Sequence, residues 1–292
     1  MVKERQKAIA VISALPSAGH FSAAVLYVTM GLLAGLVALG IRGETPDARA
    51  AVRALWEQPF GPALLLVVAL GASCLVIWRL LQAFWDLESK GRSFVGICKR
   101  IRFIVSAAFY ASVPVCAARM LFHVPTPSGE QLAEEAASAV IYFPFGWSIV
   151  LGTGMGFSIA GGYYLYRMCR GNFEGVFHCE KMRPFQRKLF FCMGRLGCAA
   201  RGIIFIVIGY YLMLAGWNVD PHQVEGQAGA LQIISRQPLG PMMLGFIALG
   251  LVALGTFSFA EVRYGRVPRE RLGHVVDCIE KVTSKSLAKG TA

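Results

Sequence analysis

The stretch Gln58-Pro59-Phe60-Gly61 decides the fold, because it occurs three times along the chain. The other copies are Phe143-Pro144-Phe145-Gly146 and Gln237-Pro238-Leu239-Gly240. Each copy follows a short polar segment and opens a long apolar one, which carries an aromatic residue near its end: Trp78, Tyr163 or Phe257. The same spacing from turn to aromatic residue in three places indicates three tandem copies of one unit.

Each copy is expected to form a turn into a new helix. A proline fixes φ at a helix start, and a glycine permits a tight turn. The residues that we expect to build these turns are Gln58, Pro59, Gly61, Pro144, Gly146, Gln237, Pro238 and Gly240.

The composition is that of an integral membrane protein. Of the 292 residues, 55% are hydrophobic and only 16% are charged, whereas about a quarter of the residues in a soluble domain carry charge. The apolar residues gather in six stretches of roughly 20 residues, the length that crosses a bilayer as a helix. These stretches are 20–41, 62–85, 102–122, 147–168, 196–216 and 241–263. The sequence therefore predicts an all-α protein with six transmembrane helices in a single membrane domain.

The charges predict how the chain is oriented. Of the 29 Lys and Arg residues, 22 lie near the N-terminus, in 86–102, in 167–195 and from Arg263 onward. The alternating segments 42–61, 119–146 and 217–240 hold only five basic residues but eight acidic ones. Positive residues stay on the cytoplasmic side of a membrane, so both termini are predicted to be cytoplasmic and the three turns to face outward.

The net charge of +12 could suggest nucleic acid as a partner. Because the positive-inside arrangement already accounts for it, no nucleic acid is expected. The basic ends are instead expected to meet anionic headgroups of the lipid bilayer on the cytoplasmic side.

The repeats are predicted to span 17–88, 99–172 and 191–266, followed by a basic cytoplasmic tail at 267–292. Every unit begins and ends on the same side, so the units are parallel and related by rotation about the membrane normal. Three such two-helix units favour a pseudo-threefold bundle, with a linear row of hairpins as the alternative.

Several local features add to this picture. Residues 1–16 are expected to form a basic lead before the first helix. Pro46 and Asp47 suit a helix start, and Val52, Leu55 and Trp56 would share one face of an amphipathic helix in the headgroup layer. The GxxxG spacings Gly31/Gly35 and Gly152/Gly156 predict close helix packing. Gly154, Gly161 and Gly162 add to the second pair, and for this glycine-rich helix a substrate path lined by exposed backbone is the alternative to tight packing.

A family resemblance rests on motifs that recur in register. Ala54-Leu55-Trp56-Glu57 precedes the first turn and Ala230-Leu231 the third. Gly194-Arg195-Leu196-Gly197 leads into Ala200-Arg201-Gly202, and Trp78-Arg79-Leu80-Leu81-Gln82-Ala83 follows the first turn. These motifs resemble a bacterial membrane family catalogued as a domain of unknown function (number twelve-oh-six). The resemblance covers nearly the whole chain and implies three two-helix units in a bacterial inner membrane, without implying an activity.

The repeats differ from one another at one position. The third unit has Arg201-Gly202 where the first has Ala23-Ala24 and the second has Ser106-Ala107. The second turn also has Phe143 in place of the glutamine. If the Arg-Gly pair is functional, only the third unit carries it.

Aligning the repeats on the turns predicts a polar layer near the cytoplasmic end. Gln82, Arg167 and Glu261 occupy equivalent positions, Arg79 lies one helical turn from Gln82, and Arg201 lies at about the depth of Glu261. Ionisable groups at such depth are costly and often functional, so Arg79, Gln82, Arg167, Arg201 and Glu261 could hold an anion or relay a proton. The alternative is that Arg79 and Arg167 reach the headgroups while Arg201 pairs with Glu261 as a structural ion pair.

No motif supports catalysis, a cofactor or a metal. No two of the five histidines stand three or four residues apart, and His178-Cys179 with nearby cysteines matches no zinc spacing. We therefore expect no enzyme. An accessory or scaffold subunit that binds lipid or another membrane protein is favoured, because mid-membrane charge is scarce. A transporter or channel for a small solute or ion is the alternative, with the polar layer as its binding site.

Overall fold

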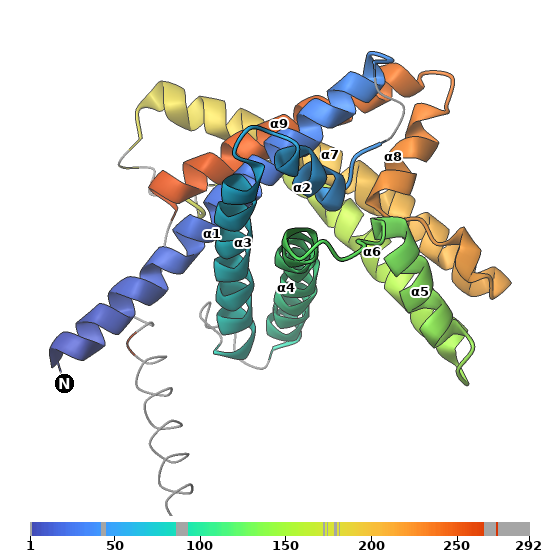
Figure 1. Ribbon diagram of the computed structural model, residues 1–292, viewed down its shortest axis with the longest axis horizontal. Helices are drawn as coiled ribbons and strands as arrows, with labels where there is room; N and C mark the ends of the chain where they lie inside the picture. Colours follow the sequence, from blue (N-terminus) through green and yellow to red (C-terminus); the bar gives the residue numbers. More distant parts are fainter. Residues whose placement is uncertain are drawn as a thin grey trace, which may run out of the picture.

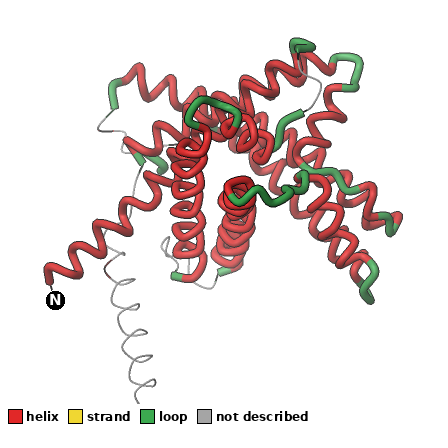
Figure 2. The backbone as a smooth tube through the Cα atoms, in the orientation of Figure 1, coloured by secondary structure: helices red, strands yellow, loops and turns green. Residues whose placement is uncertain are grey.

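The computed structural model describes residues 2–41, 45–85, 93–171, 173, 175–177, 180, 182–265 and 273. The tail predicted at 267–292 and the pair His178-Cys179 therefore lie outside the described residues, except for Gly273. The described elements are helical (Figures 1 and 2). They are α1 (Val2–Ala38), α2 (Ala48–Trp56), α3 (Gly61–Phe84), α4 (Phe94–Leu121), α5 (Gly129–Ile141), α6 (Gly146–Arg170), α7 (Pro184–Asn218), the short 3-10 helix η2 (Pro221–Gln223), α8 (Gln227–Ser235) and α9 (Gly240–Tyr264).

Five of the six predicted spans lie in helices that are long and apolar enough to cross a membrane. Within the described residues these stretches are Ile9–Ala38, Gly61–Phe84, Gly96–Leu121, Pro184–Asn218 and Gly240–Tyr264. The predicted span 147–168 forms α6, which has 25 residues but is less apolar, because it contains six glycines and three tyrosines. The described chain is thus a multi-pass membrane protein with five clear candidate crossings.

Three helices, α1, α4 and α7, begin well before their predicted spans. The lead expected at residues 1–16 is wrong, because α1 is helical from Val2 and continues through Pro16. Most residues of this segment, such as lysine, arginine, glutamine and alanine, are good helix formers. Likewise α7 begins at Pro184 rather than at residue 196, since proline is favoured in the first turn of a helix.

The long helices form three closely packed pairs: α1 with α9, α3 with α4, and α6 with α7. In Figure 1 the α1/α9 pair and the α6/α7 pair cross near the middle of the molecule, and α3 and α4 run side by side from there toward the lower edge. Helix α1 also packs on α3, and α9 on α7. The helices therefore form a row in the order α4, α3, α1, α9, α7, α6, with α4 and α6 at its two ends.

This arrangement corrects the expected hairpin of the second repeat. The two long helices of that repeat, α4 and α6, pack on α3 and α7 respectively, and no comparable packing joins them to each other in the part of the chain described. The reason lies in the glycines of α6. Gly154 and Gly161 face Gly209 and Gly202 of α7, and a Cβ at either α6 position would lie 2.8 Å from a backbone oxygen of α7.

The predicted GxxxG pair of α6 does not take part in this packing. Close packing of this glycine-rich helix is confirmed at Gly154 and Gly161, but a Cβ added at Gly152 or Gly156 would meet no atom within 4 Å, so these two positions take no part in it. Gly31 of α1 does pack closely, because its Cβ would lie 2.8 Å from the Ala248 carbonyl oxygen of α9. Sequence spacing alone does not tell which face of a helix meets its neighbour.

The three repeated turns share one backbone hydrogen bond. The N–H of Gly61 donates to the Gln58 carbonyl at 2.8 Å, as Gly146 does to Phe143 at 2.8 Å and Gly240 to Gln237 at 2.7 Å. Each glycine is the first residue of its helix. The positive φ of 65° belongs to Phe60 and Phe145, the residues before the first two turn glycines. Glycine is therefore required at these turns because a side chain would not fit there, and not because of its φ.

The three short connecting helices α2, α5 and α8 meet at their N-terminal ends. Thr45 Oγ1 donates to the Ala228 carbonyl at 2.7 Å, and Arg49 Nη1 donates to the Pro127 carbonyl at 2.8 Å. Asp47 caps α2, since its carboxylate accepts from Ala50 N at 2.7 Å. The helix start predicted there is confirmed. Val52 is fully buried in the core, so this face of α2 packs against the rest of the bundle.

Candidate functional site

The centre of the molecule is a cluster of Arg201 and three tyrosines. Arg201 of α7 donates to the Tyr27 hydroxyl of α1 and, at 3.5 Å, to the Tyr110 hydroxyl of α4. The two hydroxyls are 2.8 Å apart. The guanidinium carbon also lies 4.9 Å from the Tyr27 ring centroid and 5.7 Å from that of Tyr164 in α6. One cation thus connects four helices, including the α4 and α6 that do not pack on each other.

Small residues on α7 make this convergence possible. Ala200 is fully buried and lies against Gly250 of α9, where a Cβ would be 2.5 Å from that of Ala200. Gly202 lies against Gly161 and Leu165 of α6. Because the residues on both sides of Arg201 are small, both neighbouring helices approach α7 closely. The approach of α6 brings Tyr164 within reach of Arg201.

Glu261 of α9 pairs with His20 of α1. The distance from His20 Nδ1 to Glu261 Oε2 is 3.1 Å, and the two side chains are only 17% and 19% exposed. The expected ion pair between Arg201 and Glu261 is therefore wrong: within the described chain, Glu261 binds His20 and Arg201 binds tyrosine hydroxyls. The tight packing of α1 on α9 places His20 closer to this carboxylate than Arg201 is.

The remaining predicted residues form two further groups. Arg79 Nη1 donates to Gln82 Oε1 at 3.0 Å within α3, and its guanidinium lies 5.7 Å from the Phe103 ring centroid of α4. Its Nε is buried without a hydrogen-bond partner. Arg167 lies over the ring of Phe173 at 4.8 Å. The five residues of the predicted layer are thus distributed over several contacts, not gathered around one cavity.

These groups still influence one another through their charges. Glu261 interacts electrostatically with Arg79 and Arg167 as well as with His20. Arg79 in turn experiences the repulsion of Arg102 and Arg201. Among the described residues, the Arg79 and Arg167 guanidinium groups therefore both interact with the Glu261 carboxylate, and positive charge is in excess around it. Such a region can attract an anion.

The described residues offer no evident metal centre. No group of three or more His, Cys, Asp or Glu side chains within them is placed to hold a metal ion.

Sequence reasoning missed the partners of the central arginine. Tyr27 and Tyr110 occupy equivalent positions of the first two repeats, four residues after Ala23 and Ser106, and this equivalence was a usable signal. Tyr164 comes from a third helix and has no such counterpart. It also missed Arg195, whose Nε and Nη2 donate to the Met168 and Cys169 carbonyls at 2.9 and 3.0 Å. These bonds satisfy carbonyls at the C-terminal end of α6. The only signal for this role was the motif Gly194-Arg195-Leu196-Gly197.

Carboxylates cluster where the connecting helices meet. Asp47 is only 8% exposed, and its carboxylate lies against Gly129 at the start of α5. Glu225 and Glu130 both lie against Gly229 of α8, whose Cβ would be 2.9 Å from Glu130 Oε1. Burial and the charge of Asp47 raise the pKa of Glu130. Burial and the charge of Glu130 raise the pKa of Glu225, an effect that Arg236 partly opposes.

These raised pKa values predict that acid stabilises the connecting helices. Each of these carboxyl groups has a higher pKa in the folded protein than in the unfolded chain. At pH values between the two pKa values, the folded protein binds more protons than the unfolded chain does. The free energy of unfolding therefore falls as pH rises through that interval. Thermal unfolding in detergent should therefore occur at higher temperature at about pH 5 than at neutral pH. Glu130→Gln and Glu225→Gln should raise stability at neutral pH and weaken the pH dependence.

The exposed Glu57 provides the control for this prediction. Glu57→Gln should leave the pH dependence unchanged. A wild-type protein that becomes more stable as pH rises over the same interval would contradict the mechanism.

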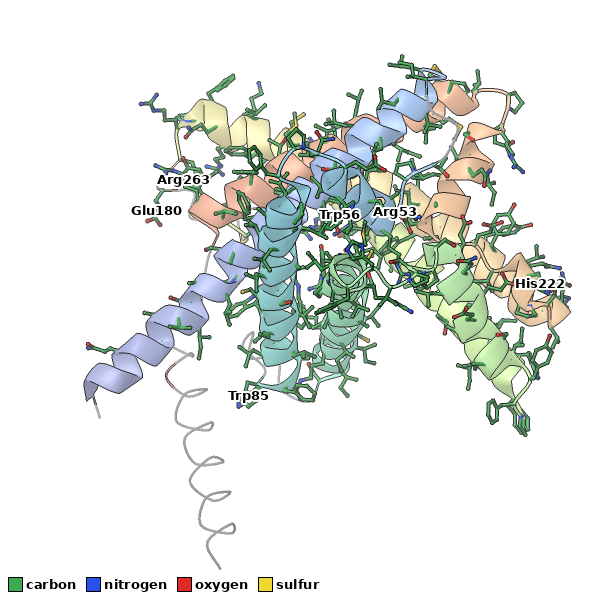
Figure 3. The ribbon with its side chains drawn as sticks, viewed as in Figure 1. Arg53, Trp56, Trp85, Glu180, His222 and Arg263 are labelled. Atoms are coloured by element: carbon green, nitrogen blue, oxygen red, sulfur yellow. The ribbon has the colours of Figure 1, made fainter. Side chains whose placement is uncertain are left out.

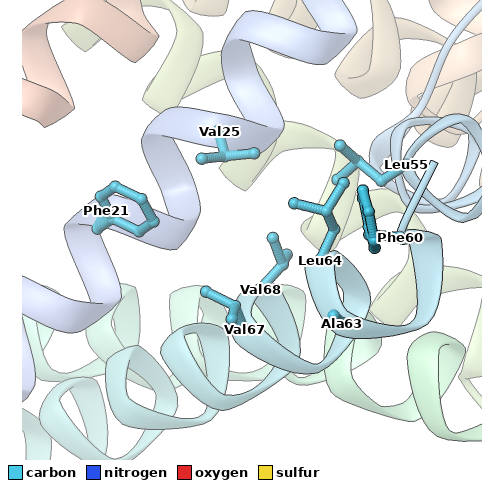
Figure 4. Close-up of a pocket in the computed structure, with 8 residues that line it drawn as sticks. All are labelled: Phe21, Val25, Leu55, Phe60, Ala63, Leu64, Val67 and Val68. Atoms are coloured by element: carbon cyan, nitrogen blue, oxygen red, sulfur yellow. The ribbon is translucent and has the colours of Figure 1, made fainter. Parts of the chain in front are cut away.

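The pockets that stand out lie at the periphery of the described chain. One is an apolar groove of about 240 Å³ between α1, α2 and α3. Figure 4 shows Phe21 and Val25 of α1 on one side of this groove and Leu64, Val67 and Val68 of α3 on the other. The second, of about 300 Å³, lies on α6 between Tyr163, Tyr166, Arg167 and Arg170. Neither pocket is lined by a residue of the central cluster around Arg201.

Comparison with known proteins agrees with the repeat. The family model described as Domain of Unknown Function (DUF1206) matches the chain twice, at residues 18–86 and 196–265. A relative from Bacillus subtilis (strain 168), "Uncharacterized protein YxxB", is 31% identical over 244 residues, which cover 84% of this chain and 88% of the relative. The chain belongs to this family. The DUF1206 matches fall on the first and third repeats and leave out the second, which supplies Tyr110 and Tyr164. No solved structure matches the chain.

Proposed function

We propose that this protein is a non-enzymatic accessory or scaffold subunit that binds lipid or another membrane protein within the bilayer. The observation that carries this proposal is the location of the two pockets that stand out in the described chain. Both open at the periphery, where a membrane protein meets lipid, while the interior is filled by side chains such as Met30, Leu75 and Ile247, each at most 1% exposed.

The central polar groups fit a structural role as well. Arg201, Tyr27 and Tyr110 bind one another, and His20 binds Glu261. A buried polar network whose members satisfy each other fixes the relative positions of the helices that contribute them. Such a network holds the helix pairs at their crossing, as a scaffold requires.

The proposal includes α6 as the sixth crossing and places both termini in the cytoplasm of a bacterium. The distribution of basic residues supports this orientation. Figure 3 is compatible with it, since Glu180 and Arg263 lie together at one edge of the molecule and His222 at the opposite edge. A membrane-impermeant maleimide should label Gln58→Cys and Arg236→Cys from outside in intact cells and Lys188→Cys only after permeabilisation.

Closure of the interior is tested by cysteine accessibility in a variant whose eight native cysteines are replaced. Met30→Cys and Ile247→Cys should stay unlabelled in membranes over the time in which Gln58→Cys reacts fully. Labelling of both interior positions by a water-soluble reagent would reveal an aqueous path and overturn the proposal.

Anion transport is the second candidate, because among the described residues Arg79 and Arg167 both interact with Glu261, and Arg79 Nε has no hydrogen-bond partner. Purified protein in liposomes would then release chloride or phosphate, and Arg201→Gln would reduce the rate. Under the scaffold proposal, these liposomes leak no faster than protein-free ones.

A further inference from the structure

The outward face of α6 differs from the other lipid-facing surfaces. Gly152, Gly156 and Gly162 are exposed and have open space where a Cβ would stand. They lie away from the glycines that contact α7. Since α6 is at one end of the row of helices, no long helix of the described chain covers this face. Gly152 and Gly156, one helical turn apart, leave a strip of bare backbone on it, the glycine channel.

The pocket on α6 lies beside this channel, at the basic end of the helix. Its four lining residues are two arginines and two tyrosines, without a carboxylate. Arg170 donates one hydrogen bond to the Tyr166 hydroxyl, and Arg167 stacks on Phe173. A guanidinium has five donors, and within the described part of the chain these contacts leave donors on both arginines for a further partner.

Basic residues often lie at a helix C-terminus because they interact with its carbonyls. Here that role is filled by Arg195, which binds the Met168 and Cys169 carbonyls. Arg167 and Arg170 are therefore not needed for the cap. The two guanidinium groups instead line a concave site of about 300 Å³.

We propose that this site binds the phosphate of an anionic phospholipid in the cytoplasmic leaflet, with an acyl chain lying along the glycine channel. The inference rests on the proposed function, and it specifies the ligand as a lipid. Arginine pairs with phosphate through two parallel hydrogen bonds, and tyrosine suits the interface between headgroups and acyl chains.

The dimensions fit one leaflet. Gly156 and Arg167 are separated by 11 positions, which corresponds to about 16 Å along a helix. Half of the hydrocarbon core of a bilayer is about 15 Å thick. A lipid whose phosphate contacts Arg167 would thus reach the level of Gly156 with the end of its chain.

The test uses the purified full-length protein, with phosphatidylglycerol and phosphatidylcholine as probes. Native mass spectrometry should detect one retained phosphatidylglycerol per protein and much less phosphatidylcholine. Arg167→Gln/Arg170→Gln should weaken retention at least about tenfold, since each lost hydrogen bond to a charged group costs about 1.5–3 kcal/mol. The control Arg183→Gln/Lys188→Gln removes two exposed charges at the start of α7, one from its N-cap residue and one from the helix itself, and should retain the lipid.

A second variant probes the acyl-chain channel. Gly156→Leu adds a side chain where nothing lies within 4 Å, so folding should be unaffected while the channel is filled. Retention should fall although both arginines remain. Excess inorganic phosphate should not displace the lipid, because the acyl chain contributes to binding.

Equal retention of both lipids, or unchanged retention in the double arginine variant, would overturn the site. So would displacement by inorganic phosphate, which would reveal a site for the free ion. These outcomes leave the proposed function in place as long as the interior cysteines stay unlabelled. Labelling of the interior would instead reject the scaffold proposal, whatever the lipid result.

Discussion

Alanine in place of Gly61 is expected to destabilise the protein by about 4 kcal/mol, at the severe end of single substitutions. The added Cβ would lie 2.7 Å from the carbonyl carbon of Trp56 and closer still to its oxygen. The backbone cannot easily shift to relieve this clash, because the N–H of Gly61 is hydrogen-bonded to the Gln58 carbonyl and Pro59 has a fixed φ. Gly146→Ala and Gly240→Ala should behave alike, since their Cβ atoms would meet the carbonyls of Val140 and Ser235.

Gly35→Ala is the matched control for this prediction. Its Cβ would lie 3.9 Å from that of Ala248, an ordinary packing distance, so stability should change little. Size-exclusion chromatography in mild detergent measures the fraction of folded protein, and unfolding with a denaturing detergent, followed by tryptophan fluorescence, measures the loss of stability. If Gly61→Ala is as stable as Gly35→Ala, the turn does not have the backbone geometry described above.

Removing one hydroxyl from the central cluster should cost more than removing its cation. Tyr27→Phe takes a hydrogen bond from the buried Arg201 and is expected to lower the free energy of unfolding by about 2 kcal/mol. Arg201→Met should cost less, because the Tyr27 and Tyr110 hydroxyls keep their 2.8 Å bond. A buried charge that has lost its partner is more costly than an apolar side chain of similar size.

The double variant makes this comparison quantitative. Tyr27→Phe/Arg201→Met should be about as stable as Arg201→Met alone, because the hydroxyl matters mainly while the charge is present. Tyr210→Phe on the exposed face of α7 is the control and should be neutral. If Arg201→Met proves the more damaging single change, the cation itself holds the four helices together.

The helices and the repeat could be predicted from the sequence because they depend on local properties. An apolar run such as 62–85 becomes a helix wherever the backbone must satisfy its own hydrogen bonds, and the structure has α3 at Gly61–Phe84. The turn glycines could be predicted because the repeated motif places each of them two residues after a proline, whose fixed φ favours a turn. In α6, glycine and tyrosine lowered the hydropathy, so its crossing is the least certain from sequence and stays part of the proposed function.

For the candidate site, the sequence predicted which polar residues take part but not which residues they contact. The equivalent positions in the repeats identified Arg79, Gln82, Arg167, Arg201 and Glu261 as polar groups at depth. Their partners were not predictable, because a pairing between helices depends on how each helix is rotated and where it crosses its neighbours. A rotation of one residue, about 100° on a helix, decides whether Glu261 meets His20 or Arg201.

By itself, then, the sequence determined a membrane-embedded helical chain with a repeated proline-glycine turn, since hydropathy and turn chemistry act within a few residues. Only the tertiary structure decided that α4 and α6 stay apart, that Arg201 binds tyrosines of other helices, and that three glycines of α6 remain uncovered. These features depend on close contacts between distant segments, which exist only once the helices have packed.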